Sequence, residues 1–321
     1  MQFICLLQTG RNICLREKAL IFDIKRDCSE DGPGIRTTVF FKGCPMSCVW
    51  CQNPEGINPK PGLSFNEAVC TSPDCGNPCI LVCQAKCLVN TSPIQAINAS
   101  CTRCERCFPV CPTRALEPVG RWVTVEELLY EVCIDKPFYT SSGGGVTLSG
   151  GEPTFQMEFI GRFLQALKKE GIHTAIETCG FFSYRHFQEQ ALPFLDIIYF
   201  DLKLVDDASS LDYTGCSNHC ILENFSRLSG ESNVPIVPRI PLIPEITATK
   251  ENLTGIARFL KKHNISSCSL MPYNPLWKDK LKRLGLTAKY KRNTFMTKTE
   301  EKNGIEYFLS ALAIQPLTVY Q

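Results

Sequence analysis

Three closely spaced cysteines are the residues of this chain best suited to metal chemistry. Cys44, Cys48 and Cys51 stand at Cys-x3-Cys-x2-Cys spacing. They follow residues 37–41, whose β-branched and aromatic side chains predict a strand, so they lie on a loop that leaves a strand end. Thiolates held this close can bind one iron–sulfur cluster. A four-iron cluster would keep one iron free of cysteine, and without a fourth protein ligand that iron would be open to a small molecule.

The competing interpretations of this trio are a zinc site and spare thiols. Zinc in structural sites usually takes four ligands, with cysteines in pairs. No obvious partner pair accompanies these three cysteines in the sequence. The spacing therefore favours a cluster.

A glycine-rich turn stands at the end of another predicted strand, residues 145–149. Its sequence is Ser149-Gly150-Gly151-Glu152-Pro153. Glycine lets backbone groups approach a ligand closely, and a carboxylate such as that of Glu152 accepts hydrogen bonds from an ammonium group. Such a turn is common by itself. Together with the cysteine trio, it indicates a ligand that has both an amine and a metal-binding end.

A second group of cysteines has the spacing of a bacterial ferredoxin. Cys101, Cys104, Cys107 and Cys111 follow Cys-x2-Cys-x2-Cys-x3-Cys-Pro, in which the fourth cysteine serves the other cluster of a pair. The upstream half is irregular, and its best match is Cys70, Cys75, Cys79 and Cys83, with Gln84 in place of the usual proline.

This pattern predicts a pairing of ligands. One 4Fe–4S cluster would take Cys70, Cys75, Cys79 and Cys111, and the other would take Cys101, Cys104, Cys107 and Cys83. Two alternatives stay open: Cys87 replaces one of the irregular ligands, or one of the two clusters is lost.

The composition favours metal binding over disulfide bonds. The chain has 321 residues, 20 cysteines and a formal net charge of +2. This charge gives no electrostatic case for binding nucleic acid or an anionic membrane. No apolar run reaches about 18 residues, so we expect no transmembrane helix. Residues 1–7 are apolar but lack a basic segment and a clear cleavage site, so we expect a cytoplasmic protein.

Seven lone cysteines are expected to be small buried hydrophobic residues rather than ligands. They are Cys5, Cys14, Cys133, Cys179, Cys216, Cys220 and Cys268.

Strands and helices must position the cysteine and glycine-rich motifs, and the apolar periodicity of the sequence predicts an α/β fold. Strands are expected at residues 19–24, 37–41, 145–149, 173–178, 196–201, 236–243 and 267–273. Helices are expected from Thr124, with a capping box to Glu127, and at residues 158–170, 184–191, 250–263 and 300–313. The alternation implies βαβ units and parallel strands. Because roughly six to seven units are too few for an eight-fold barrel, we expect a partial (β/α)6-type barrel.

Residues 57–118 differ in composition from the rest of the chain. Proline, asparagine, serine and cysteine dominate, and long apolar periodicity is missing. This composition predicts an inserted ferredoxin-like module that is held together by its cofactors. The predicted organisation is therefore a barrel in two parts, residues 1–56 and 119–321, interrupted by the insert.

One further loop, Asp31-Gly32-Pro33-Gly34-Ile35-Arg36, is tight because two glycines surround a proline. It is either a plain turn or a loop that presents Asp31.

In combination, these motifs resemble those of the radical S-adenosylmethionine (SAM) enzymes. The cysteine trio followed by Gly-Gly-Glu carries that resemblance. The Asp31–Arg36 loop and the segments 41–45 and 51–56 around the trio are similar to the activating enzymes of glycyl-radical enzymes, of the pyruvate formate-lyase type. The resemblance runs from about residue 20 to the C-terminus.

The resemblance implies a set of site residues. Cys44, Cys48 and Cys51 would hold the 4Fe–4S cluster, whose open iron would bind the amino and carboxylate groups of SAM. Ser149, Gly150, Gly151 and Glu152 would line the methionine amine. The other implied SAM contacts are Asn53, Glu177, Thr178, Asp201, Lys203, Arg239 and Asn274, although some relatives have histidine at the place of Asn274. Each acidic residue in this set has the alternative of a helix cap or a solvated loop.

Further roles follow from the same resemblance. Asp31 and Lys203 are the candidate catalytic residues, Asp31 through contact of its loop with the partner's glycine loop. In some relatives, the places of Glu177, Thr178 and Asp201 help to bind a monovalent cation. The carbonyl of Tyr199 could add an oxygen ligand there.

The implied function is that of a glycyl-radical enzyme activating enzyme. It would cleave SAM reductively to methionine and a 5′-deoxyadenosyl radical, which removes a hydrogen atom from a glycine of a partner enzyme. A flavodoxin or a ferredoxin-type protein would be the reductant, and the inserted clusters would relay electrons or be structural. The alternatives are a radical SAM enzyme that acts on a small molecule or peptide, and a pure electron-transfer protein.

Overall fold

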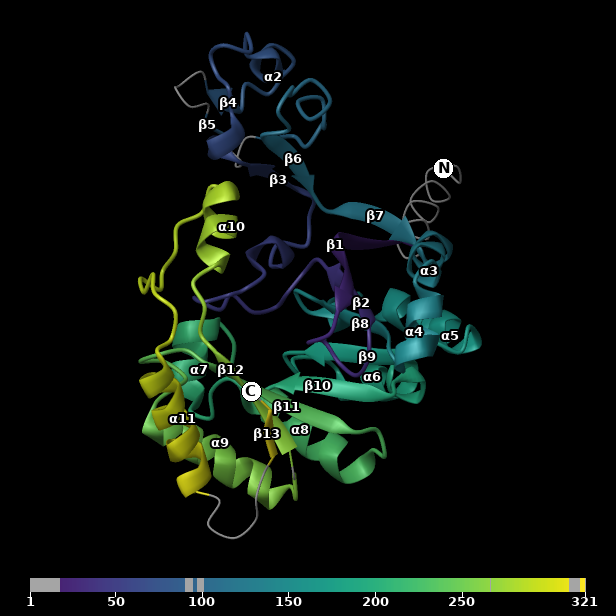
Figure 1. Cartoon of the computed structure of the whole chain (residues 1–321), viewed down its shortest axis with the longest axis vertical. Coiled ribbons are helices and arrows are strands. Elements are labelled where there is room, and N and C mark those ends of the chain that lie inside the picture. Colours follow the sequence, from purple (N-terminus) through teal and green to yellow (C-terminus); the bar gives the residue numbers. More distant parts are fainter. Residues whose placement is uncertain (1–17, 90–94, 97–100, 266, 312–317, 321) are drawn as a thin grey trace, which may run out of the picture.

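The centre of the protein is a nine-stranded sheet with the strand order β13-β12-β11-β10-β9-β8-β2-β1-β7 (Figure 1). The structure is a computed structural model, and it describes residues 18–89, 95–96, 101–265, 267–311 and 318–320. In this part of the chain, β2 and β8 to β13 are parallel to one another, and β1 is antiparallel to β2 and β7. The apolar residues 1–7, Cys5 and Cys14 lie outside the described residues.

The strands of this sheet are β1 (Lys18–Cys28), β2 (Arg36–Phe41), β7 (Arg121–Thr124), β8 (Gly145–Gly150), β9 (His173–Thr178), β10 (Ile197–Asp201), β11 (Ile236–Leu242), β12 (Ser267–Pro272) and β13 (Thr318–Tyr320). The helices that accompany it are α3 (Val125–Cys133), α4 (Lys136–Ser142), α5 (Met157–Lys169), α6 (Tyr184–Gln190), α7 (Asp207–Thr214), α8 (His219–Glu231), α9 (Lys250–Lys262), α10 (Trp277–Arg283) and α11 (Lys298–Ser310). Short 3-10 turns occur at η1 (Pro54–Gly56), η2 (Glu67–Val69), η4 (Pro153–Gln156) and η5 (Leu192–Phe194).

The two faces of the sheet differ because side chains alternate along each strand. On β8, Val146 and Leu148 are fully buried in the main apolar core, whereas Thr147 and Ser149 point to the other face and form polar contacts. The core face packs against α5, α6, α8, α9 and α11, whose apolar residues belong to the same cluster. The opposite face is the inner face of a partial barrel, and it carries the polar groups.

This arrangement confirms the predicted α/β fold of parallel strands with alternating helices. The capping box of Thr124 and Glu127 is present at the start of α3. On β10, Ile198 and Phe200 are fully buried in the core. Ile197, Tyr199 and Asp201 are half-buried, because they face the interior of the barrel rather than a second layer of helices.

The described residues between 57 and 118 form a small unit beyond the sheet, at the top of Figure 1. Its elements are β3 (Gly62–Phe65), α2 (Pro78–Leu81), β4 (Leu88–Val89), β5 (Gln95–Ala96) and β6 (Leu116–Val119). The antiparallel pair β3–β6 closes the unit where the chain enters and leaves it. Its buried apolar cluster is small and contains Leu63, Cys79, Cys87, Leu88 and Leu116. The exact domain boundaries at 57 and 118 stay a prediction.

No helix in the described part of the chain combines the length and the apolar character needed to cross a membrane.

Candidate active site

A cavity of about 220 Å³ lies at the carboxyl edge of the parallel strands, beneath the loop that follows β2. Ligands of parallel α/β folds bind at this edge. Thirteen of the predicted site residues line it together: Cys44, Cys48, Cys51, Asn53, Ser149, Gly150, Gly151, Glu177, Thr178, Asp201, Lys203, Arg239 and Asn274. Two predicted residues, Glu152 and Asp31, are not part of its wall.

The cysteine loop is fixed by its backbone to α7. The amide of Ser47 donates to the carbonyl of Thr214 at 2.8 Å, and the amide of Val49 donates to that of Tyr213 at 3.0 Å. The amide of Cys51 donates to the carbonyl of Cys48 at 3.1 Å, which makes a tight turn between these two cysteines. The loop therefore presents its three thiols to one cavity.

Gly150 and Gly151 join the end of β8 to the cysteine loop. The amide of Gly151 donates to the carbonyl of Phe41 at 2.8 Å. A Cβ atom on Gly151 would stand 2.5 Å from the carbonyl oxygens of both Gly43 and Gly56, which is far closer than van der Waals contact. Only glycine allows these backbones to approach, so the Gly-Gly pair brings the cysteine loop down onto the sheet edge.

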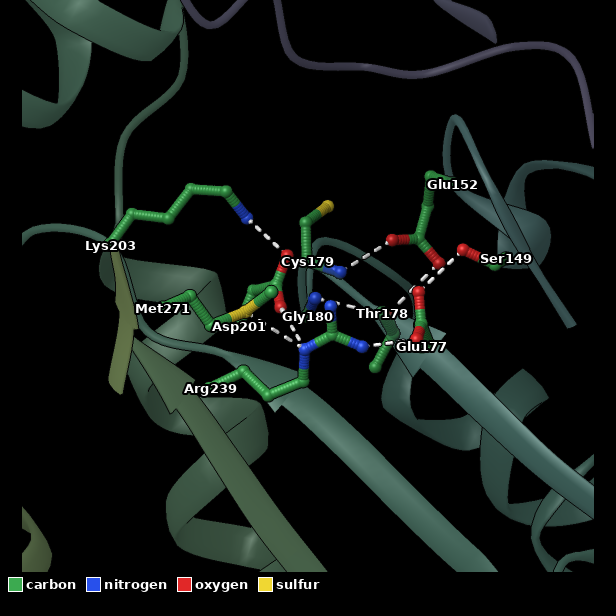
Figure 2. A network of polar contacts seen from close by, with 10 residues as sticks. All are labelled: Ser149, Glu152, Glu177, Thr178, Cys179, Gly180, Asp201, Lys203, Arg239 and Met271. Atoms are coloured by element: carbon green, nitrogen blue, oxygen red, sulfur yellow. Dashed lines mark hydrogen bonds and ion pairs between the residues drawn. The ribbon is translucent and has the colours of Figure 1, made fainter. Parts of the chain in front are cut away.

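A network of charged side chains forms the floor of the cavity (Figure 2). Arg239 of β11 pairs with Glu177 of β9, and the hydroxyl of Ser149 donates to the other carboxylate oxygen of Glu177 at 2.5 Å. Lys203 lies 3.0 Å from the carboxylate of Asp201, whose other oxygen is 3.9 Å from the Nε atom of Arg239. Two cations and two carboxylates thus neutralise one another at neighbouring strand ends.

The network sets the charge states of its members. Burial raises the pKa of Glu177, and the guanidinium of Arg239 opposes that rise. Burial lowers the pKa of Lys203, but the carboxylate of Asp201 and the thiol of Cys48 outweigh it and the net pKa is raised. Lys203 therefore stays protonated beside the cysteine loop.

Glu152 has a different environment from the one expected for a contact with a ligand amine. It is completely buried, and its carboxylate accepts hydrogen bonds from the amide and hydroxyl of Thr154. It also accepts from the hydroxyl of Thr178 at 2.9 Å and the amide of Cys179 at 2.7 Å (Figure 2). These bonds join the ends of β8 and β9.

Asp31 lies against the inner face of β2 and β8 rather than in the cysteine loop. Its carboxylate accepts from the hydroxyl of Thr38 at 2.6 Å, and its carbonyl accepts from that of Thr147 at 2.8 Å. The six residues of β2 span about 20 Å at about 3.3 Å per residue. Because Thr38 is the third residue of β2, Asp31 lies about halfway along this strand, inside the barrel, where its charge acts on Glu177 and Arg239.

Several residues that line the cavity were not predicted from the sequence. They are Met46, Trp50, Gln52, Cys179, Pro241 and Ile243. Cys179 is the most consequential, because its thiol hydrogen-bonds to that of Cys44 and lowers the pKa of Cys44. Its position directly after Glu177-Thr178 was the available signal, since residues that follow a strand end share its edge.

Of the remaining lone cysteines, Cys268 is buried as expected, and Cys133, Cys216 and Cys220 are partly buried.

The donor set fits an iron–sulfur cluster with a small polar ligand. Burial raises the pKa of Cys48 and raises that of Cys51 to about 12. A cationic metal centre would offset the cost of burying two negative charges and would hold both groups as thiolates. Beside the thiols, the cavity offers cations, carboxylates and glycine backbone, which suit a ligand with amino and carboxylate groups.

The cysteines of the insert fall into two groups. One pocket is lined by Cys83, Cys87, Cys101, Cys104 and Cys107. In the other group, burial raises the pKa of Cys79, and the nearby Cys111 and Cys75 raise it further. Cys70 packs in the apolar cluster of the insert, which contains cysteines of both groups, so its assignment to the Cys79 group stays a prediction. This grouping agrees with the predicted ligand pairing, which stays a prediction, and it adds Cys87 as a fifth thiol to one site.

Two family models match the chain. Residues 100–260 match the radical SAM superfamily, and residues 30–73 match the 4Fe-4S single cluster domain. The second match contains Cys44, Cys48 and Cys51. These matches confirm the predicted radical SAM family and assign an iron–sulfur cluster and SAM as cofactors.

Known activating enzymes are similar over most of the chain. The isethionate sulfite-lyase activating enzyme of Nitratidesulfovibrio vulgaris is 38% identical, over 80% of this chain and 84% of that protein. The trans-4-hydroxy-L-proline dehydratase activating enzyme of Clostridioides difficile is 38% identical, over 88% of this chain and 93% of that protein. A solved radical SAM methyltransferase from Sphaerobacter thermophilus covers 94% of this chain, and 76% of its own chain is matched, with a TM-score of 0.53 and 14% identity, which supports the fold alone. With its fold, cavity and similarity over most of its length taken together, the chain belongs to the radical SAM superfamily and, within it, to the activating enzymes of glycyl-radical enzymes.

Proposed function

We propose that Cys44, Cys48 and Cys51 bind the 4Fe–4S cluster and that SAM lies beside it in the cavity at the carboxyl edge. When bound, the cluster supplies the electron that splits SAM into methionine and a 5′-deoxyadenosyl radical, and this radical removes a hydrogen atom from a glycine of the partner enzyme. The observation that supports this assignment is the meeting of three thiols, two cations and two carboxylates in one cavity.

The chain's own residues bind and orient the ligand. The amine of SAM would meet the backbone of Gly150 and Gly151 and the hydroxyl of Ser149, and its carboxylate would meet Lys203 and Arg239. These groups are held in place before the ligand arrives, because each charged side chain already has a partner. Preorganisation of this kind reduces the cost of orienting a ligand.

Two asparagines would add polar contacts at the rim. Asn53 accepts from the ammonium group of Lys280 at 3.2 Å, and the carbonyl of Asn274 accepts from the side chain of Gln52 at 3.3 Å. These bonds tie the cysteine loop to the segment after β12, so both asparagines face the cavity from fixed positions.

A monovalent cation is part of the proposal. The carboxylates of Glu177 and Asp201 and the carbonyls of Thr178 and Tyr199 are the oxygen donors that suit a hard cation. Arg239 contacts both carboxylates, so the cation and this guanidinium would share them.

Glu152 and Asp31 do not line the cavity, and we propose indirect roles for them. Glu152 would position the Gly-Gly turn through Thr178 and Cys179. For Asp31 to contact the partner, the partner's glycine loop would have to enter the barrel as far as the level of Thr38. The hydrogen bonds of Asp31 favour instead a role in holding its loop against β2 and β8.

The insert is proposed to hold two further 4Fe–4S clusters that relay electrons from a flavodoxin or a ferredoxin-type reductant. The two groups of thiols support two clusters rather than one. A cytoplasmic location belongs to the same proposal, because cysteines grouped at ligand spacings need a reducing compartment.

The decisive experiment uses the full chain, reconstituted with iron and sulfide without oxygen. With dithionite and SAM, we expect 5′-deoxyadenosine from the parent protein and none from Cys44→Ala, Cys48→Ala or Cys51→Ala. The relatives' names supply a panel of partners, including isethionate sulfite-lyase and trans-4-hydroxy-L-proline dehydratase. A glycyl radical detected by electron paramagnetic resonance in one of them would identify the partner. SAM cleavage by a Cys48→Ala variant would overturn the assignment of the cluster.

A further inference from the structure

The insert contains the same turn twice. In the first copy, the amide of Lys86 donates to the carbonyl of Cys83 at 3.0 Å, and Lys86 has a positive φ of 49°. In the second copy, the amide of Arg114 donates to the carbonyl of Cys111 at 3.3 Å, and Arg114 has a positive φ of 53°. A leucine starts a strand two residues later in both copies, β4 and β6.

This correspondence gives Cys87 a structural equivalent. The fifth residue of the first turn is Cys87, and the fifth residue of the second is Ala115. Both are buried, with exposed fractions of 6% and 2%. The ferredoxin pattern takes one ligand from each turn, at the positions of Cys83 and Cys111. The thiol of Cys87 is therefore additional to that pattern, at a place where the second turn has only a methyl group.

The additional thiol lies within reach of the same cluster. The Sγ atoms of Cys83 and Cys87 are 3.3 Å apart, and both residues line the pocket that also holds Cys101, Cys104 and Cys107. The four cysteine ligands of a four-iron cluster each bind a different iron, at a different corner of the cube. Their sulfur atoms therefore lie much farther apart than the 3.3 Å between Cys83 and Cys87. Cys83 and Cys87 thus point to a single corner, and only one of them can occupy it at a time.

We propose that Cys83 and Cys87 are interchangeable ligands of one iron in the cluster held by Cys101, Cys104 and Cys107. In the exchange, the bond from iron to the sulfur of Cys83 breaks as the bond to the sulfur of Cys87 forms. The proton of the Cys87 thiol passes to Cys83, and no electron is transferred. The inference rests on the proposal that the insert holds clusters.

The two positions would give the cluster different surroundings. Cys83 is half-buried at the start of the turn, whereas Cys87 is buried in the small apolar core of the insert. A cluster that loses its bond to Cys83 would be retained by the more protected Cys87. The two thiols would therefore protect the cluster whose fourth ligand, Cys83, is followed by Gln84 instead of the usual proline.

The test counts iron and sulfide in the reconstituted full chain, with electron paramagnetic resonance of the reduced clusters as a second readout. We expect Cys83→Ala and Cys87→Ala to keep all the iron of the parent protein, and the double variant to lose one four-iron cluster. A single variant that loses as much iron as the double variant would overturn the proposal. Each single variant should also shift the signal of one reduced cluster, and unchanged spectra in both would contradict ligand exchange.

The second turn provides the matched control. Cys111→Ala should lose a cluster, because Ala115 offers no thiol, and the pair Cys111→Ala with Ala115→Cys should regain it. Failure to regain it would contradict the claim that this turn lets both positions reach the iron. A parent protein with the iron of only one cluster would instead refute the proposed clusters of the insert, so the two failures are distinguishable.

Discussion

Charge balance at the floor of the cavity depends on individual side chains. Glu177, Asp201, Lys203 and Arg239 are mostly buried, and each carboxylate has a cationic partner. Removing one partner of a buried pair leaves an uncompensated charge and is strongly destabilising, whereas exposed pairs contribute little. Substitutions here should therefore affect both ligand binding and stability.

Lys203→Met should weaken the binding of SAM by about 10-fold or more, because a hydrogen bond to a charged group contributes about 1.5–3 kcal/mol. Titration of the reconstituted protein with SAM, followed by the signal of the reduced cluster, measures this change. Lys168→Met is the matched control, since Lys168 pairs with Asp196 far from the cavity and is more exposed. Equal affinities of the Lys203 and Lys168 variants would contradict a contact between Lys203 and SAM.

Substitution of Cys179 tests whether the cluster has an iron that no cysteine binds. Its thiol lies beside Cys44, but we expect Cys179→Ala to retain the full iron content and the cleavage of SAM, because the three cysteines of the loop are sufficient ligands. Cys44→Ala should lose that cluster. Loss of iron from the Cys179 variant would make Cys179 a fourth ligand and would leave no iron for SAM.

The direction of the Glu152 side chain could not be predicted from its residue type. Its place in Gly-Gly-Glu predicts a carboxylate near an amine, but four donors from the chain itself surround that carboxylate. The direction of a side chain depends on neighbours from another strand, and no local pattern encodes them.

Glu152→Gln should therefore lower the stability more than the affinity for SAM. Its amide nitrogen would face donors that need an acceptor, at a cost of about 1–3 kcal/mol. Thermal unfolding and SAM titration of the same samples separate the two effects. A large loss of affinity without a loss of stability would favour a direct contact with the ligand amine.

At the scale of elements, α10 connects the insert to the cluster loop. Lys282 pairs with Glu67 of η2 at 2.9 Å, and Lys280 donates to the carbonyl of Gln52 at 3.1 Å and to Asn53. This helix was not predicted, because seven residues with mixed charges show little periodicity. The strands that carry the site and the 13-residue helices α5, α9 and α11 were predicted well, since their apolar residues repeat over whole turns or pleats, whereas the 13-residue helix α8 was not predicted.

Lys280→Met should loosen the cluster loop and speed the loss of iron to a chelator, because it removes bonds to two neighbouring residues of that loop. Absorbance of the iron–chelator complex over time measures the rate. Lys282→Met should behave like the parent protein, since its ion pair is exposed and worth about 0–1 kcal/mol. Identical rates for all three proteins would show that α10 does not brace the loop.

For the whole molecule, local motifs predicted more than long-range geometry. Cysteine spacing identified three thiols that meet in one cavity, and the parallel course of the main strands followed from the alternation of strands and helices. The antiparallel course of β1 and the half-buried position of Asp31 inside the barrel were not predictable, because both depend on which distant segments share an edge. The fifth thiol of the insert became significant only when the two turns could be superposed in structure.

The amino edge of the barrel contains one fully buried charged residue with a mechanical consequence. Arg36 donates to the hydroxyl of Thr147 and to the carbonyls of Val146 and Pro33, and no part of it reaches solvent. This side chain fills the amino end of the barrel, so we expect SAM and the partner's glycine to reach the cavity from the side of the cluster loop. We therefore expect SAM to bind before the partner's glycine covers that side. Bound partner should therefore slow the release of methionine, which rapid filtration with labelled SAM would measure.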